Sequence, residues 1–314
     1  MSAMLIRVSQ LSYVYNAGTP LAIEALRGIN LEIAQGEYVA LVGHNGSGKS
    51  TLAKCLNGLL RPTAGEVWVN GLATHDPAAL PEIRATVGLV LQHPDNQFVA
   101  TEVEEEVAFG PENLGLPWAE LRRRVDWALR ETDLEALRGR DPRTLSAGQK
   151  ARLAIAGILA MRPACLVLDE ATAMLDPLSR QEVLALVRRL HGEGLTVVTI
   201  THRMEEVVWA DRLVVLERGQ VVLEGPPRQV LAQAELLEGL GLGLPPAAVV
   251  AQGLRRRGLP LAQALLTGEE LAGALAVMRK ESSVRRGLAA ADGDGSALSA
   301  PAIGSSPRAL RTDG

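Results

Sequence analysis

The segment GHNGSGKST, from Gly43 to Thr51, constrains this chain more than any other part of it. It has the spacing of a phosphate-binding loop, in which a glycine is followed by four residues and then by Gly-Lys-Ser/Thr. The apolar, β-rich EYVALVG precedes the segment, and KSTLAKCLNGLL, with apolar residues at helical spacing, follows it. Because strand, loop and helix in this order are the context in which the motif binds phosphate, we expect a nucleotide site in an α/β fold.

The chemistry of the loop follows from its residue types. Its glycines allow a tight turn whose backbone amides point inward, and the start of the helix adds partial positive charge. We expect Lys49 to reach the β- and γ-phosphates and Ser50 to ligate Mg²⁺. The residues predicted to bind ATP here are Gly43, His44, Asn45, Gly46, Ser47, Gly48, Lys49, Ser50 and Thr51.

A second motif, CLVLDE from Cys165 to Glu170, is a short apolar run that ends in two carboxylates. In a parallel sheet such a run is a central strand, and its carboxyl end faces the ligand crevice. We expect Asp169 to hold the Mg²⁺ shell and Glu170 to act as general base toward the attacking water. A third apolar run, LTVVTITH, ends at His202, which is then within reach of the γ-phosphate; a purely structural histidine is the alternative.

Taken together with Gln92 and the segment LSAGQK, from Leu145 to Lys150, these motifs resemble the ATP-binding cassette (ABC) ATPases over about Leu5 to Leu240. The resemblance implies that Gln92 senses the metal and a membrane partner, and that His202 holds the γ-phosphate and the attacking water. Ala147 stands where the family signature has glycine. Further nucleotide contacts implied by the resemblance are Tyr15, stacking on adenine, Ser146, Gly148 and Gln149, reaching ATP on the opposing subunit, and Asp176, crossing the dimer interface.

The sequence from Val87 to Pro117 resembles the corresponding segment of energy-coupling factor (ECF) transporter ATPases, and so does DEATAMLDP from Asp169 to Pro177. This resemblance implies an ATP-hydrolysing A component at the cytoplasmic face of the cell membrane. Such a subunit powers import of vitamins or transition-metal ions. Its partners are a membrane-embedded T component, a substrate-binding S component and a second ATPase subunit, either a copy or a paralogue.

Other functions stay open at this point. A conventional ABC importer ATPase would carry the same nucleotide motifs, although the neighbourhood of Gln92 argues against it. A soluble ABC ATPase outside transport usually has two cassettes or a long coiled coil, whereas this chain has one phosphate loop and no sustained heptads. A nucleotide-sensing module without turnover is disfavoured because Glu170 and His202 are both present.

The segment TEVEEEVAF, from Thr101 to Phe109, predicts a short, strongly acidic amphipathic helix. Such a helix is either a solvated acidic face or a docking surface for basic residues of a partner. The longer segment from His93 to Gly110 contains this helix and directly follows Gln92, so we hypothesise that it transmits the nucleotide state to the T component.

Composition and patterning complete the prediction. The chain has 314 residues and a net charge of −4, which argues against a general nucleic-acid binder. Cys55 and Cys165 have no metal spacing and are expected in the core. We expect an ABC-type P-loop domain at 4–240, with a β-rich N-terminal subdomain and a helical subdomain inserted at about 92–150. A small helical extension at 245–280 and a disordered tail at 281–314 should follow.

Overall fold

The computed structural model describes residues 3–262 and 265–292, and the chain divides into two compact units, Met1–Thr267 and Gly268–Gly314. The first unit contains two sheets and most of the helices. The second contains the helix α10, Gly268–Asp292. The mixed α/β architecture expected from the sequence is present in the first unit, which also holds every residue that we predicted at the nucleotide site.

A six-stranded sheet forms the centre of the first unit, in the order β10-β9-β3-β8-β7-β6. Pairing from β9 to β6 is parallel, and β10 pairs antiparallel with β9 at the edge. The three apolar runs that we expected as buried strands are the neighbours β3, β8 and β7, and every residue in them is buried. The strand bounds are β3 Tyr38–Val42, β6 Val87–Val90, β7 Cys165–Asp169, β8 Thr196–Ile200, β9 Arg212–Glu217 and β10 Gln220–Gly225.

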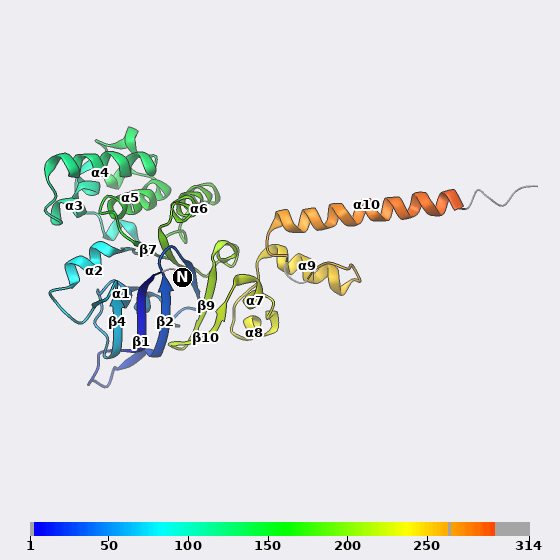
Figure 1. The fold of residues 1–314 in the computed structure, drawn as a ribbon, viewed down its shortest axis with the longest axis horizontal. Coiled ribbons are helices and arrows are strands. Elements are labelled where there is room, and N and C mark those ends of the chain that lie inside the picture. The colour runs from blue at the N-terminus through cyan, green and yellow to red at the C-terminus, as the bar shows by residue number, and fades with distance from the viewer. Residues whose placement is uncertain (1–2, 263–264, 293–314) are drawn as a thin grey trace, which may run out of the picture. The chain divides into compact units, whose positions relative to one another are not determined.

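A second, antiparallel sheet has the order β2-β1-β4-β5, and β1, β2 and β4 lie side by side in Figure 1. It shares a core with one face of the large sheet and with helix α1, Lys49–Leu56. Cys55 and Cys165 belong to this core, which confirms the prediction that they are core residues, and burial raises the pKa of both thiols to about 12. The bounds are β1 Met4–Tyr15, β2 Ile23–Ala34, β4 Ala64–Val69 and β5 Leu72–Ala73, followed by helix α2, Leu80–Thr86.

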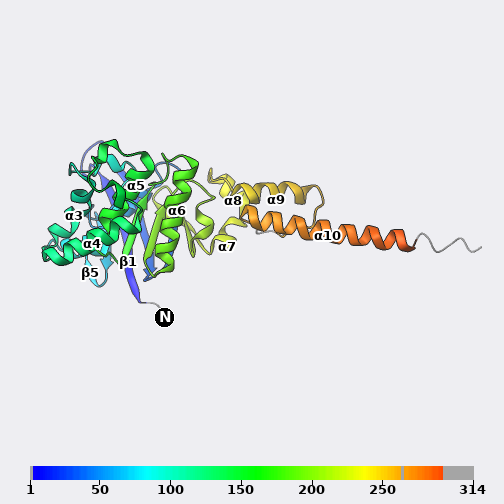
Figure 2. The same cartoon turned by 90° about the horizontal axis from the view of Figure 1, so that it is seen from above.

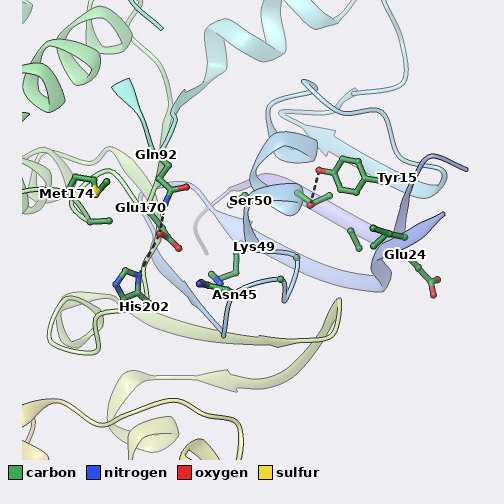
Figure 3. A pocket seen from close by; sticks show the side chains of 15 residues that line it. Tyr15, Glu24, Asn45, Lys49, Ser50, Gln92, Glu170, Met174 and His202 are labelled. Atoms are coloured by element: carbon green, nitrogen blue, oxygen red, sulfur yellow. Dashed lines mark hydrogen bonds and ion pairs between the residues drawn. The ribbon is translucent and has the colours of Figure 1, made fainter. Parts of the chain in front are cut away.

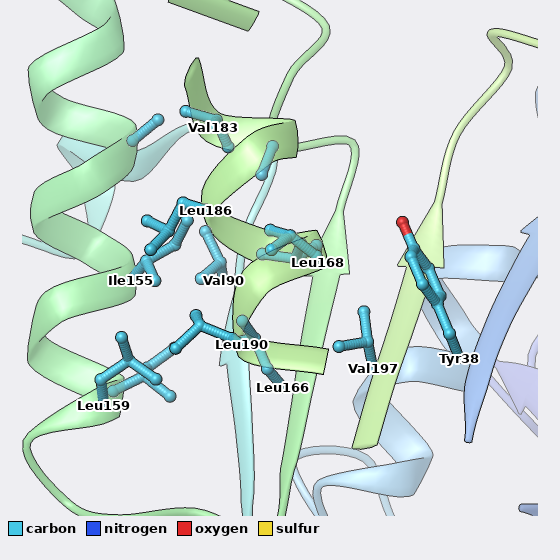
Figure 4. Packing of buried hydrophobic residues seen from close by; sticks show 14 of the residues in the cluster. Tyr38, Val90, Ile155, Leu159, Leu166, Leu168, Val183, Leu186, Leu190 and Val197 are labelled. Carbon is cyan, nitrogen blue, oxygen red and sulfur yellow. The ribbon is translucent and has the colours of Figure 1, made fainter. Parts of the chain in front are cut away.

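The other face of the large sheet packs on helices α5, Ala147–Leu159, and α6, Pro177–Gly192. Figure 4 shows Ile155 of α5 and Leu190 of α6 beside Leu166 and Leu168 of β7. Alternate residues of each strand face opposite cores because side chains in a strand point alternately to its two sides. In β7, Leu166 and Leu168 contact the helices while Val167 faces the second sheet.

The predicted helical insertion is present as α3, Val103–Asn113, and α4, Trp118–Glu131, packed with α5 (Figures 1 and 2). The acidic run opens α3, as expected, but much of its charge is used within the subdomain. Glu104 forms ion pairs with Arg122 and Arg138. Glu106 accepts hydrogen bonds from the backbone amides of residues 99 and 100. Of the three consecutive glutamates, only Glu105 is exposed.

The C-terminal part differs from the expected boundaries. Short helices α7, Pro227–Leu231, and α8, Ala234–Gly239, precede α9, Pro246–Arg256. Residues Ala248 of α9 and Leu266 join the core of the first unit, so the units divide at Thr267 rather than near residue 240. Helix α10 continues to Asp292, past the expected end at Lys280, because residues 281–292 are mostly good helix formers without proline. The rest of the predicted disordered tail lies outside the described residues.

Helix α10 has 25 residues, the length of a membrane span. Charged residues interrupt its apolar positions. Neither α10 nor any other helix among the described residues is both long and apolar enough to cross a membrane.

Packing of α5 on β6 generates a stability prediction. A Cβ added at Gly88 of β6 would lie 2.1 Å from the Cγ2 atom of Ile158. We expect Gly88→Ala to lower the free energy of unfolding by about 1–3 kcal/mol, the usual cost of overpacking a core. Urea denaturation of the full chain measures the change.

Two controls sharpen this test. Gly192→Ala adds the same methyl group to an exposed helical site with nothing within 4 Å, and should leave stability unchanged or slightly raised. Ile158→Ala removes the clashing methyl group. It should therefore lower the free energy of unfolding less in the Gly88→Ala background than in the wild-type chain. Equal urea midpoints for wild type and Gly88→Ala contradict the packing described here.

Candidate functional site: a phosphate-binding cavity

A cavity of about 830 Å³ opens at the carboxyl ends of β3, β7 and β8. Parallel strands bring their carboxyl ends to one edge of a sheet, and the loops that follow them meet there. Figure 3 shows side chains from these loops and from β1 and β2 around the cavity. The predicted site residues that line it are Tyr15, Asn45, Gly46, Gly48, Lys49, Ser50, Thr51, Gln92, Glu170 and His202.

The phosphate loop has the predicted strand-loop-helix form, because β3 ends at Val42 and α1 begins at Lys49. Two of its glycines need a left-handed backbone, with φ of 82° at Gly46 and 104° at Gly48. A Cβ on Gly48 would also lie 2.6 Å from the carbonyl oxygen of Ala25. Glycine is therefore required at residue 48 for its conformation and for the close approach of β2.

The ammonium group of Lys49 is held inside the loop. Its Nζ donates hydrogen bonds to the carbonyl oxygens of Gly43, at 2.8 Å, and His44, at 2.9 Å. Burial lowers the pKa of Lys49, while the negative charges of Glu170 and Asp169 act in the opposite direction. Because the hydrogen-bond partners are neutral carbonyls, the positive charge remains available to a phosphate group.

Ser50 and Asp169 come from different elements and meet at the cavity wall, which Ser50 lines. The hydroxyl of Ser50, in the first turn of α1, donates to Oδ1 of Asp169, at the end of β7, over 2.9 Å. Burial raises the pKa of Asp169, and the hydrogen bond from Ser50 opposes this shift. The described residues contain no cluster of three or more His, Cys, Asp or Glu that could hold a metal by itself. The hydroxyl and carboxylate oxygens instead suit an Mg²⁺ ion shared with a phosphate.

Glu170 is held between two other predicted residues. Nε2 of Gln92 donates to Oε2 of Glu170 over 3.1 Å, and Nδ1 of His202 lies 3.7 Å from the same oxygen (Figure 3). The backbone of Glu170 is left-handed, with φ of 51°. Such a conformation costs roughly 1–3 kcal/mol in a residue other than glycine, and it is concentrated at functional sites. Three loops, following β6, β7 and β8, thus converge on one carboxylate.

Tyr15 ends β1 at the opposite side of the cavity. Its hydroxyl lies 3.2 Å from the hydroxyl of Thr51, and its ring meets the ring of Tyr13 edge to face. Ile23 pairs with Tyr15 in the strand register and also lines the cavity. We did not predict Ile23 from the sequence, because its place depends on the register of β1 against β2. Glu24 and Ala25 of β2 were missed in the same way, and Ala173 and Met174 line the cavity from the loop that follows Glu170.

Three residues of the predicted loop shape it from behind instead of lining the cavity. Ser47 is fully buried. A Cβ at Gly43 would lie 2.3 Å from the carbonyl oxygen of Leu216. Nε2 of His44 lies 2.8 Å from Oε2 of Glu217, so its side chain points to the β9–β10 hairpin. Contact of Gly43, His44 and Ser47 with the nucleotide stays a prediction, and it would be made by their backbone groups.

The signature segment lies away from this cavity. Ser146 caps the N-terminus of α5 in a reciprocal capping box with Gln149. Gly148 packs so tightly that an added Cβ would lie 2.6 Å from Ser179 of α6. Ala147 is the first helical residue of α5, a conformation that any L-residue adopts, so its methyl group introduces no backbone strain.

Asp176 also lies outside the cavity wall. Its Oδ1 accepts hydrogen bonds from the backbone amides of Leu178 and Ser179, which caps α6. Ser146 and Asp176 are therefore exposed at the starts of their helices and Gln149 is half-buried, whereas Gly148 is buried against α6.

Comparison with known proteins places this geometry in a family. Residues 26–173 match the ABC transporter model. The chain is 58% identical over 252 residues to the energy-coupling factor transporter ATP-binding protein EcfA1 of Symbiobacterium thermophilum, covering 80% of this chain and 88% of the relative. It is 49% identical over 270 residues to EcfA1 of Caldanaerobacter subterraneus subsp. tengcongensis, covering 86% and 98%.

Solved structures agree with these relatives. CbiO1 from Clostridium perfringens, described as part of the ABC transporter complex CbiONQ, superimposes with a TM-score of 0.67 at 38% identity, covering 76% of this chain and 95% of CbiO1. The ATP-binding cassette MJ0796, solved as a dimer bound to ADP and Pi, superimposes with a TM-score of 0.65 at 30% identity, covering 71% and 99%. This chain therefore belongs to the ABC transporter ATPases and, within them, to the energy-coupling factor transporter ATP-binding proteins.

Proposed function

We propose that this ABC ATPase hydrolyses ATP as one of two cassettes in an importer for a vitamin or a transition-metal ion. The transported substrate would pass through a membrane-embedded T component and a substrate-binding S component. The names of the relatives support an ECF system over a conventional importer. One observation carries the catalytic part: Glu170 lies on the wall of the phosphate cavity, in contact with both Gln92 and His202.

Each side chain has a distinct task in this proposal. Lys49 and the amides of the glycine-rich turn neutralise phosphate charge, and Tyr15 stacks on adenine. Glu170 accepts a proton from the attacking water. His202 holds the γ-phosphate and that water in line. The shared contact of Gln92 and His202 with Glu170 keeps the carboxylate directed at the water.

The side-chain oxygens of Ser50, Asp169 and Gln92 are ligands that suit Mg²⁺. Two of these oxygens, on Ser50 and Asp169, already lie 2.9 Å apart. When bound, the ion would offset negative charge on the β- and γ-phosphates. Asp169 is held in place by its hydrogen bond with Ser50 and is 4% exposed, so its carboxylate is shielded from solvent and would be available to the ion.

The first prediction from this site is that Glu170→Gln keeps ATP binding and loses turnover. The amide preserves shape but cannot accept the proton of water, so we expect hydrolysis to fall by about 10²- to 10⁴-fold. Steady-state hydrolysis by the reconstituted complex and calorimetric ATP titration measure the two properties. Lys49→Ala is the matched contrast, because it should weaken ATP binding itself. A Glu170→Gln complex with wild-type turnover contradicts the assignment of the base.

A second subunit completes the site in this proposal. Ser146, Gly148 and Gln149 lie outside the cavity of their own chain, and the relative MJ0796 was solved as a dimer. We infer that these residues contact ATP held by the facing cassette, with Asp176 crossing the same interface. The facing cassette is either a copy of this chain or a paralogue.

This arrangement predicts a concentration dependence for the isolated chain. If each active site needs the signature of a facing subunit, specific ATPase activity should rise with protein concentration until the dimer is saturated. Activity measured across a dilution series, with sedimentation on the same samples, tests it. Ser146→Arg should abolish the rise while leaving ATP affinity of the monomer unchanged. A constant specific activity from a monomer would refute the shared site.

A groove in the helical subdomain is the proposed contact with the T component. It has a volume of about 150 Å³, and Phe98, Phe109 and Met161 contribute to its wall. Phe109 is 48% exposed, and Val99, which directly follows Phe98, is 64% exposed.

The segment from 93 to 110 begins directly after Gln92, so a partner bound to this groove can respond to the nucleotide state. With Glu104 and Glu106 engaged internally, apolar contact now has more support than the acidic docking face. Binding here would place the subunit at the cytoplasmic face of the membrane.

Substitutions at two exposed residues of α3 distinguish the apolar contact from the acidic docking face. Phe109→Ser should reduce co-purification with the T component and substrate uptake, because it removes apolar surface from the groove. Glu105→Lys reverses the one exposed charge among the three consecutive glutamates and should change both properties little. ATP affinity of the free subunit should stay at the wild-type value in both variants. The opposite pattern, with Glu105→Lys disruptive and Phe109→Ser silent, restores the acidic face as the contact.

A further inference from the structure

A buried carboxylate next to the active site has no part in the mechanism described above. Glu206 follows His202 by four residues and is 2% exposed. Thr172 follows Glu170 by two residues, and its hydroxyl lies 2.9 and 3.1 Å from the two carboxylate oxygens of Glu206. The loop that carries Glu170 and the loop that carries His202 are therefore joined inside the protein.

A third element supplies the opposite charge. Nε of Arg180, in α6, lies 4.0 Å from Oε1 of Glu206, and its Nη2 donates to the carbonyl oxygen of Leu175 over 2.8 Å. A buried carboxylate is costly unless it is paired and hydrogen-bonded. The cluster Thr172–Arg180–Glu206 meets this condition with one hydroxyl and one guanidinium. Leu175 directly precedes Asp176, so the cluster also reaches the segment expected at the subunit interface.

The position of the cluster explains what it can do. Glu170 and His202 approach each other to 3.7 Å, yet both lie on loops, where side-chain positions are set by neighbouring contacts. The hydrogen bond from Thr172 to Glu206 connects these loops at residues two and four positions past the two functional side chains. The phosphate loop belongs to another connection, after β3, and its lysine is held by carbonyl oxygens of that same loop.

We propose that Thr172, Arg180 and Glu206 form a positioning cluster that sets the distance between Glu170 and His202. None of the three lines the cavity, so they act through the two residues that do. The proposal rests on the role of Glu170 as general base. In this proposal Glu206 keeps Glu170 and His202 at a constant distance from each other during turnover.

Thr172→Val is the direct test, because it removes the hydroxyl and keeps the shape of the side chain. Thr172→Ser is the matched control, since it keeps the hydroxyl. In the reconstituted complex we expect kcat of Thr172→Val to fall by about 10- to 100-fold, as for a small misplacement of a catalytic group. KM for ATP and calorimetric ATP affinity should stay within about twofold, because the phosphate loop is built separately. Thr172→Ser should keep most of the wild-type kcat.

Glu206→Gln provides a second route if Thr172→Val folds poorly. Its amide oxygen can still accept the hydroxyl of Thr172, so the fold should persist while the charge pair with Arg180 is lost. We expect a smaller fall in kcat, again without loss of ATP affinity. Thermal unfolding of each variant separates destabilisation from mispositioning.

A double-mutant cycle with Glu170→Gln distinguishes positioning from general damage. If the cluster acts through Glu170, Thr172→Val should cost little further activity once the base is already an amide. A wild-type kcat for Thr172→Val, equal losses in Thr172→Val and Thr172→Ser, or full additivity in the cycle would each overturn the proposal. Glu170→Gln with full activity would instead overturn the assignment of the base, which keeps the two failures distinct.

Discussion

The parallel pairing of β3, β8 and β7 is the constraint on which the nucleotide site depends. The register aligns Val39 with Val198 and Leu166 with Val197, so the three strands end together at one edge of the sheet. The phosphate loop, the Glu170 loop and the His202 loop all leave from that edge. A slip of one residue in any strand would turn its buried side chains to the wrong face and displace its functional residue. Packing on both faces of the sheet therefore protects the geometry of the site.

Charge is the second organising factor. Lys49, Asp169 and Glu206 are all buried; Lys49 is held by carbonyl oxygens of its own loop, whereas Asp169 and Glu206 have partners from other segments. Buried charges without such partners would be strongly destabilising. The partners come from loops after different strands, so the electrostatic requirements of single residues also tie these loops to one another. The left-handed backbone of Glu170 is tolerated within this tightly held arrangement.

Much of this site was predictable, because its motifs combine local structure with chemistry. The strands that end at Val42, Asp169 and Ile200 were predictable because each is a short apolar run. Lys49 and Glu170, for which the motifs predict roles, both lie on the cavity wall. The family followed from the same motifs. Serine is a preferred N-cap residue, so the capped start of α5 at Ser146 follows from local residue preference.

Contacts between distant segments were not predictable in the same way. The bond between Thr172 and Glu206 joins residues 34 positions apart, and nothing in either local pattern marks it. Ile23 reaches the cavity through strand register, and His44 turns to Glu217 because a hairpin from the end of the domain packs under the phosphate loop. The acidic run of α3 looked like a surface in sequence, but Arg138, more than thirty residues away, neutralises part of it.

The cap of α6 has a consequence for assembly. Both backbone amides at the helix start donate to the same oxygen of Asp176, Oδ1. The hydrogen bonds from Ser179 and Leu178 also lower the pKa of Asp176, which keeps the carboxylate ionised. Folding thus orders this side chain before any partner arrives. The Asp176 side chain is thus already ordered in the monomer and would lose little further rotational entropy at the proposed interface. Association would be correspondingly easier.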